Sequence, residues 1–340
     1  MPWTTADIPD LPAATAVVTG ANSGIGYHTA LELARKGAHV VLACRSAERG
    51  AAAVERLRGA LPDASVELLR LDLASLDSVR AFAEAFRARH DRLDLLVNNA
   101  GLMAIPHATT PDGFEMQIGV NHFGHFALTG LLLDRLLEGA PARVVTVSSQ
   151  VHHAGRLDFD DLDGHRRYHK WRAYAASKLA NLLFAFELHR RLPAEAGVAS
   201  VAAHPGYADT NLQGVGPRLH GSGAGERLWG VVNRLFAQRA SMGALPTLHA
   251  ATAPEVAGGE FVGPRGIFGG WGYPKRVRAA RRAYDEGVAR RLWEVSVART
   301  GVDFSALAPF PHSRFVARRR SDVARDAFDR GREGGVAAPR

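Results

Sequence analysis

A tyrosine and a lysine stand four residues apart in the segment Tyr174-Ala-Ala-Ser-Lys178. On a helix, residues with this spacing lie on one face, so the lysine ammonium can lie beside the phenol oxygen. A free tyrosine has a pKa of about 10, and a nearby positive charge favours the phenolate. The pair therefore predicts a tyrosine with a lowered pKa that exchanges a proton with a substrate. The same spacing also occurs between ordinary neighbours on helix surfaces, so the surrounding elements must decide.

Strands and helices alternate along most of the chain. Apolar, β-prone runs are separated by helical patterns of apolar residues, which predicts right-handed crossovers and a parallel sheet covered on both faces. We therefore expect an α/β, doubly wound (Rossmann-type) fold with about seven strands in a single domain. The expected strands are 14–19, 39–44, 66–71, 93–98, 143–148, 198–203 and 260–262, and the expected helices after the first are 47–58, 76–89, 114–137 and 173–192.

Composition limits the class of protein. The chain has 340 residues, of which 46% are hydrophobic, and this is ample for a core. Its one cysteine, Cys44, excludes an intramolecular disulfide and predicts a small buried side chain without a redox role. The N-terminus lacks a basic region followed by an apolar one, and no run of about 18 apolar residues occurs. We expect no transmembrane segment and a cytoplasmic location.

The positive charge belongs to the last quarter of the chain. The net charge is +8, but residues 1–264 carry a net −1 and residues 265–340 a net +9. The main domain is therefore not a nucleic-acid binder by charge. The basic runs indicate a solvated helix face and, at 311–340, a poorly ordered basic tail after a domain at 1–310. An acidic partner or a phospholipid surface is the alternative.

A glycine cluster separates the first expected strand from the first expected helix. Gly20, Gly24 and Gly26 let the backbone approach a pyrophosphate, while the helix N-terminus stabilises its negative charge. After the second strand, an NAD-specific site would have an acidic residue that binds the ribose 2′-hydroxyl. This chain has Arg45 and Ser46 there, and a guanidinium can bind a 2′-phosphate. The expected cofactor is NADP(H), and NAD(H) is less favoured.

A long connection at about 206–240 is rich in glycine and proline at first and then amphipathic. Long connections of this kind often form lids over a substrate. The expectation is a lid with one apolar wall of the substrate pocket, and the alternative is a helix that packs on the core.

Taken together, these motifs resemble the short-chain dehydrogenase/reductase family over residues 14–210. Within it, the chain resembles the retinol dehydrogenase, WW-domain oxidoreductase and protochlorophyllide reductase group, through Ala43-Cys44-Arg45, Asn121-His122-Phe123-Gly124 and His204-Pro205-Gly206. The motifs of the family are Thr19-Gly20-x-x-x-Gly24-Ile25-Gly26, Asp72-Leu73, Asn98-Asn99-Ala100-Gly101, Asn121, Ser148-Ser149, Tyr174-x-x-x-Lys178 and Pro205-Gly206.

The resemblance assigns catalytic roles. Tyr174 would be the general acid in carbonyl reduction and the base in alcohol oxidation, and Lys178 would lower its pKa and hold the nicotinamide ribose. Ser149 would hydrogen-bond the reacting oxygen, with Ser148 as a strand-end neighbour. Asn121 would support a proton relay through a water molecule.

The resemblance also implies a cofactor site. Asp72 would meet the adenine, Asn99 and Ala100 the adenosine ribose, and the residues after 204 the nicotinamide. Many NADP-dependent members carry a basic residue where this chain has Ser23, so the 2′-phosphate specificity depends on Arg45. The implied cofactor-binding residues are Gly20, Ser23, Gly24, Ile25, Gly26, Arg45, Ser46, Asp72, Leu73, Asn99, Ala100, Gly101, Tyr174, Lys178, Pro205, Gly206 and Thr210.

The expected function is an NADP-dependent oxidoreductase that interconverts an apolar alcohol with its aldehyde or ketone. The alternative is a non-catalytic dinucleotide-sensing or scaffold protein of the same fold. A light-dependent reductase is disfavoured because Cys44 is the only cysteine. His152 and His153 precede several aspartates, but their spacing gives no helical ligand pair, and we expect no metal. A homodimer through the helices at 114–137 and 173–192 would fit the family, although the C-terminus could cover one of them.

Overall fold

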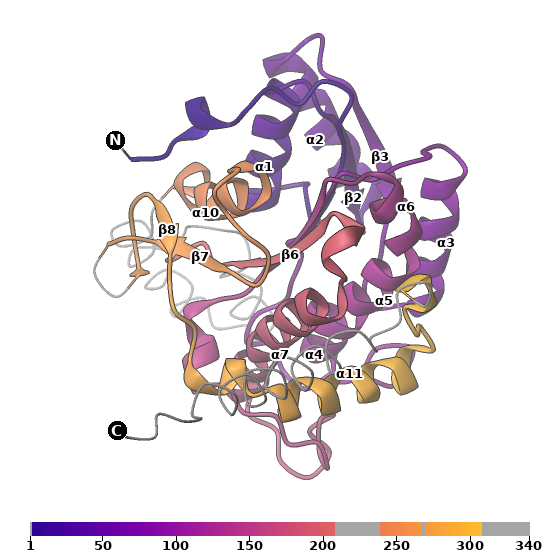
Figure 1. The fold of residues 1–340 in the computed structure, drawn as a ribbon. Coiled ribbons are helices and arrows are strands. Elements are labelled where there is room, and N and C mark those ends of the chain that lie inside the picture. The colour runs from indigo at the N-terminus through magenta and orange to yellow at the C-terminus, as the bar shows by residue number, and fades with distance from the viewer. Residues whose placement is uncertain (1, 208–238, 267–268, 308–340) are drawn as a thin grey trace, which may run out of the picture. The chain divides into compact units, whose positions relative to one another are not determined.

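The computed structural model describes residues 2–207, 239–266 and 269–307 (Figure 1). Thr210, nearly all of the expected lid and the expected tail at 311–340 lie outside the described residues. The chain divides into two compact units, Met1–Asp303 and Phe304–Arg340. In the second unit the described part contains the 3-10 turn Ser305–Leu307. Everything below concerns the first unit.

An eight-stranded sheet forms the centre of the first unit. Its strand order is β3-β2-β1-β4-β5-β6-β7-β8, and all neighbouring pairs are parallel except β7 with β8. The predicted doubly wound fold is confirmed. The strands are β1 (Thr15–Thr19), β2 (His39–Cys44), β3 (Val66–Arg70), β4 (Leu95–Asn98), β5 (Ala142–Val147), β6 (Val198–Ala203), β7 (Phe261–Pro264) and β8 (Pro274–Arg276).

The first seven strands lie within two residues of their predicted positions. They are easy to recognise because strands buried on both faces become continuous apolar runs, and all five residues of β1 are buried. The eighth strand was not predicted. It has three residues, begins with a proline and exposes Lys275 and Arg276, so it carries no apolar signal.

Helices cover both faces of the sheet (Figure 1). On one face lie α1 (Gly24–Arg35), α2 (Ala47–Ala60) and α10 (Ala240–Thr252), and on the other lie α3 (Leu76–Arg87), α5 (Gly124–Leu131) and α7 (Lys170–Arg191). Outside α7 lies α11 (Glu286–Thr300), where Trp293 stacks on Phe184 with 6.0 Å between ring centroids. The C-terminal part of this unit therefore covers one of the two helices considered for a dimer. Short 3-10 turns occur at Thr5–Asp7, Gln150–Ala154, Ala194–Ala196 and Arg281–Tyr284.

The long helix predicted at 114–137 is divided into four pieces. These are α4 (Met116–Ile118), a π-helical turn (Gly119–Phe123), α5 and α6 (Leu133–Glu138). At Gly124 an added Cβ would lie 2.5 Å from the carbonyl oxygen of Leu73, so the helix approaches the loop after β3 closely. The prediction of one continuous helix is wrong because apolar periodicity does not reveal a π-helical turn. Such turns are frequent at functional sites, and this one carries Asn121.

A helix that spans a membrane needs about 20 consecutive, mostly apolar residues. Within the described ranges, no helix is long and apolar enough to span one.

Candidate active site

The predicted site residues that the structure describes come together at one edge of the sheet. Because the strands are parallel, their carboxyl ends meet at that edge, and ligands of such sheets bind in the crevice where the strand order reverses. Here the reversal lies between β1 and β4, which are neighbours. The residues that directly follow the strand ends are Gly20 after β1, Arg45 after β2, Asn99 after β4, Ser148 and Ser149 after β5, and His204 and Pro205 after β6.

The glycine turn packs against the loop that follows β4. Gly20 has a φ of +67° and Gly24 a φ of +55°, which side chains rarely adopt. At Gly26 an added Cβ would lie 2.5 Å from Asn99 Nδ2, and at Gly20 it would lie 3.1 Å from Ala100 Cα. Larger residues at these positions would push the turn away from the loop. The turn therefore needs glycine at these positions, as the sequence predicted.

The first turn of α1 is open to an anion. Within the described residues, the N-terminal residue Ser23 makes no side-chain hydrogen bond to the helix. The hydroxyls of Ser46 and Ser75, in contrast, cap α2 and α3 by accepting hydrogen bonds from backbone N–H groups at 3.2 and 3.3 Å. Backbone N–H groups at a free helix start bind phosphate well. The turn and the helix start therefore fit the pyrophosphate of a dinucleotide.

Thr19 and His125 join the glycine turn to the rest of the site. Thr19 Oγ1 accepts hydrogen bonds from the backbone nitrogens of Asn99 and Ala100, both at 2.9 Å. The His125 ring lies between Thr19 Oγ1, 2.9 Å from Nε2, and the Asn121 carbonyl, 3.1 Å from Nδ1. Since a carbonyl only accepts, the ring proton is on Nδ1, and Nε2 accepts from Thr19. Burial, helped by the charge of Lys178, lowers the pKa of His125 to about 4, so the ring is neutral.

Replacement of His125 by Phe is expected to reduce the pH dependence of stability. The folded-state pKa of about 4 lies below the ordinary value of 6.5, so the unfolded chain takes up a proton first as the pH falls. Stability is thus full above pH 6.5 and is lost towards pH 4, at about 1.4 kcal/mol per pH unit for this one histidine. The slope of unfolding free energy against pH, measured by urea denaturation, should be smaller in the variant by the contribution of about one proton.

The control for this experiment is Thr19→Val, which removes the hydrogen bond to His125, and those from Asn99 N and Ala100 N, without removing a titrating group. It should lower stability by about 1 to 3 kcal/mol and leave the slope unchanged. An unchanged slope in His125→Phe would contradict a neutral, buried imidazole at this position.

Asn121 connects the loop after β4 to α7. Its Nδ2 donates to Leu102 O and to Ser177 Oγ, both at 2.9 Å, and its Oδ1 accepts from Leu102 N at 2.7 Å. Ser177 Oγ in turn donates to the Tyr174 carbonyl at 2.8 Å. The Asn121 side chain therefore holds the segment of α7 that lies between the tyrosine and the lysine. Ser177 is a support that the sequence analysis missed.

Tyr174, Lys178 and Ser149 lie together. The tyrosine and lysine are on α7 and are only 4% and 3% exposed. The Ser149 hydroxyl lies close enough to the Tyr174 phenol to favour its ionised form. Lys178 Nζ donates to Val147 O at 3.2 Å and lies 5.8 Å from the centroid of the Tyr174 ring. The expected catalytic side chains are therefore neighbours in one buried site.

The pKa of Tyr174 differs from the prediction. Burial raises the pKa of Tyr174 to about 12, against the opposing effect of the Ser149 hydroxyl. Burial also lowers the pKa of Lys178 to about 8. The prediction of a lowered tyrosine pKa is wrong for the protein alone, because loss of water around the phenolate outweighs stabilisation by neighbouring groups. At neutral pH the tyrosine keeps its proton.

Ser148 and His152 hold the backbone around Ser149. Ser148 Oγ donates to the Lys178 carbonyl at 2.8 Å, which gives the first serine a structural role. The His152 ring accepts at Nε2 from Ala280 N at 3.0 Å and donates from Nδ1 to Ser149 O at 2.6 Å. Burial lowers the pKa of His152 to about 4. His152 is therefore a neutral histidine that holds the turn after Ser149, a role that the sequence analysis missed.

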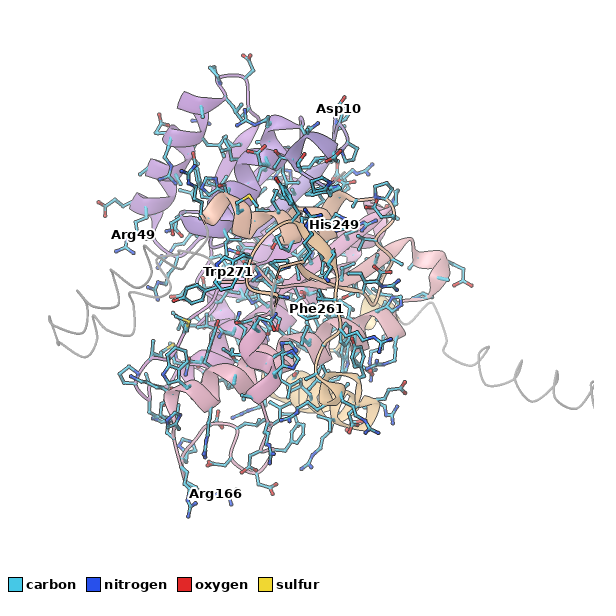
Figure 2. All side chains as sticks on the ribbon, turned by 90° about the vertical axis from the view of Figure 1, so that its left-hand side faces the viewer. Asp10, Arg49, Arg166, His249, Phe261 and Trp271 are labelled. Atoms are coloured by element: carbon cyan, nitrogen blue, oxygen red, sulfur yellow. The ribbon has the colours of Figure 1, made fainter. Side chains whose placement is uncertain are left out.

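Three arginines lie at the end of β2 and on α2. Arg45 is exposed at the end of β2, and Arg49 points outward from the first turn of α2 (Figure 2). Arg56, also on α2, lies 3.6 Å from the centroid of the Tyr27 ring, and its Nη2 is 3.5 Å from Asn22 O in the glycine turn. Arg56 brings positive charge to the turn, and no spacing in the sequence indicated it.

Other predicted cofactor residues are more strongly engaged in structure. Asp72 Oδ1 accepts from Ala74 N at 3.0 Å, and the Leu73 side chain is buried beside α5. Gly206 has a φ of +71°, and an added Cβ would lie 2.4 Å from Gly270 O. Cys44 is buried, and burial raises its pKa to about 11, which confirms the prediction of a buried side chain and leaves an unreactive thiol.

A parallel sheet with a glycine turn between its first strand and helix defines an α/β protein that binds a dinucleotide. The family model for short chain dehydrogenases matches residues 14–216, and the chain belongs to this family. Human retinol dehydrogenase 13 is 45% identical over 307 residues, 89% of each chain. Human retinol dehydrogenase 11 is 42% identical over 288 residues, 84% of this chain and 85% of the relative.

Solved structures agree with this assignment. An uncharacterized protein from Mycobacterium Paratuberculosis has a TM-score of 0.74 and 45% identity, covering 89% of this chain and 99% of its own. The Pseudomonas aeruginosa RhlG/NADP active-site complex has a TM-score of 0.57 and 25% identity, covering 74% and 94%. The predicted resemblance to the family and its retinol dehydrogenase group is confirmed. The chain is an NAD(P)-dependent dehydrogenase or reductase acting on CH–OH groups.

Proposed function

We propose that this protein is an NADP(H)-dependent oxidoreductase that interconverts an apolar alcohol and its aldehyde or ketone, with Tyr174 as the general acid or base. The observation that carries the proposal is the placement of the buried Tyr174 and Lys178 beside Ser149, at the sheet edge that also holds the glycine turn. The names of the relatives support it, since retinol dehydrogenases at 42–45% identity are named for an apolar alcohol.

Some residues of the site would bind the cofactor and others the substrate. The glycine turn and the start of α1 would hold the pyrophosphate, and Lys178 would hold the nicotinamide ribose. The nicotinamide, when bound, supplies or accepts the hydride. The hydroxyls of Ser149 and Tyr174 would both contact the reacting oxygen of the substrate, which fixes its position and stabilises the charge that develops on it.

The state of Tyr174 favours carbonyl reduction. With a pKa of about 12, its phenol is protonated across the neutral range and can donate to the carbonyl oxygen of an aldehyde or ketone. Oxidation of an alcohol requires Tyr174 to begin as a phenolate, which burial opposes. In the protein alone, Tyr174 is therefore in the form that acts as the acid in carbonyl reduction.

A preference for NADPH over NADH is expected, and Arg45 is expected to determine it. The exposed guanidinium would bind the 2′-phosphate, and a charge-assisted hydrogen bond of this kind changes affinity by about 10- to 100-fold. The test is the reduction of retinal and of shorter aldehydes and ketones, monitored by the loss of near-ultraviolet absorbance of the reduced nicotinamide. The ratio of kcat/KM with NADPH to kcat/KM with NADH should be greater than one. Replacement of Arg45 by Ser should reduce this ratio by about 10- to 100-fold.

The matched control is Arg49→Ser, which removes the outward-pointing arginine of the first turn of α2 and should leave the ratio within about twofold. An Arg45→Ser variant with the wild-type ratio would contradict the role of Arg45. Tight NADPH binding with no turnover of any aldehyde, ketone or alcohol would contradict the proposed activity and favour the sensing or scaffold alternative.

A further inference from the structure

Two histidines and a glutamate meet at the edge of the sheet formed by the amino ends of the strands, opposite the edge that holds Tyr174. His39 is the first residue of β2, Glu67 the second residue of β3, and His90 follows the end of α3. One nitrogen of each imidazole and one carboxylate oxygen of Glu67 all lie within 4.8 Å of one another. The group belongs to the amino ends of the strands, whereas the glycine turn and Ser149 follow their carboxyl ends. The proposed oxidoreductase reaction uses none of the three residues.

Two distances between these ligand atoms can be compared with those around a small divalent cation. His39 Nε2 is 3.6 Å from Glu67 Oε1, and His90 Nε2 is 2.5 Å from the same oxygen. In tetrahedral zinc sites, bonds of about 2.0–2.2 Å place the ligand atoms about 3.3–3.6 Å apart. The first distance already matches. The second requires Glu67 Oε1 to move by about 1 Å, which a flexible carboxylate side chain allows.

The surroundings of His39 orient it towards the group. Its Nδ1 is 2.7 Å from Ser65 Oγ, so the ring is held from the far side, as metal-binding histidines commonly are. Its Nε2 is buried and, among the described residues, has no hydrogen-bond partner. That nitrogen faces Glu67 with its lone pair or proton unused. The ring of His90 is held by Phe86, with 4.7 Å between ring centroids.

One positive charge competes for the carboxylate. Arg89 Nη1 lies 3.6 Å from Glu67 Oε2, but the arginine side chain is 52% exposed, and solvent weakens such a pair. The arginine contacts Oε2, whereas the two histidines face Oε1. The side chains of His39, Glu67 and His90 are 28%, 25% and 15% exposed, so a cation and its water can enter from solvent.

We propose that His39, Glu67 and His90 form a binding site for a divalent transition-metal ion of the zinc type, with water as the fourth ligand. Two neutral imidazoles and one carboxylate are a ligand set that such ions prefer, and three protein ligands leave one coordination position open. The bound ion would join β2, β3 and the end of α3. Its role would be structural, and it is independent of the proposed oxidoreductase activity.

The experiment is a calorimetric titration of the chelator-treated, untagged full chain with zinc chloride. Saturable binding of one ion is expected, and cobalt(II) should show the intense visible bands of a tetrahedral site. Each of the variants His39→Gln, Glu67→Gln and His90→Gln should weaken binding by at least about 100-fold, and Ser65→Ala by about 10-fold. The control His165→Gln removes an exposed imidazole outside the group and should bind as the wild type does.

Arg89→Gln provides a test with the opposite sign, because it leaves all three ligands and the fold in place. Removing the competing guanidinium should tighten zinc binding several-fold, even if a ligand variant fails to fold. The proposal is overturned if the wild-type chain binds no zinc, or if the Glu67→Gln and Arg89→Gln variants both bind as the wild type does. NADPH affinity of the chelator-treated and zinc-loaded proteins should be equal, which separates this site from the cofactor site.

Discussion

Replacement of Tyr174 by Phe is expected to lower kcat for carbonyl reduction by about 10²- to 10⁴-fold, the usual contribution of a general acid. Tyr174 is 4% exposed and phenylalanine keeps the shape of its ring, so the loss concerns the hydroxyl beside Ser149. The affinity for NADPH, measured by quenching of protein fluorescence, should change by less than about tenfold. A fall in kcat without loss of cofactor binding would separate proton transfer from binding.

The control is Tyr168→Phe, which removes a phenol that donates to Ile105 O and accepts from Gln117 Nε2, both at 2.8 Å. It should lower stability by about 1 kcal/mol and leave kcat within a few-fold. Wild-type kcat in Tyr174→Phe would show that Tyr174 is not the general acid. In that case another group must supply the proton to the carbonyl oxygen.

The fold and the catalytic residues were predictable because the physics that fixes them is local. Parallel strands covered on both faces become continuous apolar runs, and all residues at their carboxyl ends reach the same edge of the sheet. Once 14–19, 93–98 and 143–148 are identified as strands, Gly20, Asn99 and Ser149 must lie near one another. The four-residue spacing of Tyr174 and Lys178 then predicts a helix that presents both side chains to these strand ends.

The supports of the site were not predictable because they depend on tertiary contacts. Nothing in the sequence distinguishes His125 or His152 from the other histidines, since each gains its role from partners far along the chain. His125 binds Thr19, 106 residues away, and His152 binds Ala280, 128 residues away. The pKa of Tyr174 depends on burial by several elements, so helical spacing alone gave the wrong direction. The group of His39, Glu67 and His90 was not predictable for the same reason, because its residues come from β2, β3 and the segment after α3.

Replacement of Lys178 by Met is expected to abolish most activity and yet stabilise the protein at neutral pH. Burial lowers the pKa of Lys178 from 10.5 to about 8, and this difference corresponds to about 3 kcal/mol of unfavourable free energy for the charged form. Met has a similar length and no charge. The Val147 carbonyl keeps a partner in the variant, because Asn181 Nδ2 also donates to it at 3.0 Å. A gain of about 1 to 3 kcal/mol in unfolding free energy should therefore appear in urea denaturation at pH 7.

The pH dependence identifies the cause of that gain. Because the folded-state pKa lies below the unfolded value of 10.5, unfolding of the wild type takes up a proton between about pH 8 and pH 10.5. Wild-type stability should therefore rise with pH across this window relative to the variant. The advantage of Lys178→Met is largest below pH 8 and disappears near pH 10.5. The exposed Lys275→Met should change stability by less than about 0.5 kcal/mol at any pH. A Lys178→Met variant less stable than the wild type at pH 7 would mean that the buried ammonium is held by partners that outweigh its loss of water, and Lys178 would then support the fold as well as the reaction.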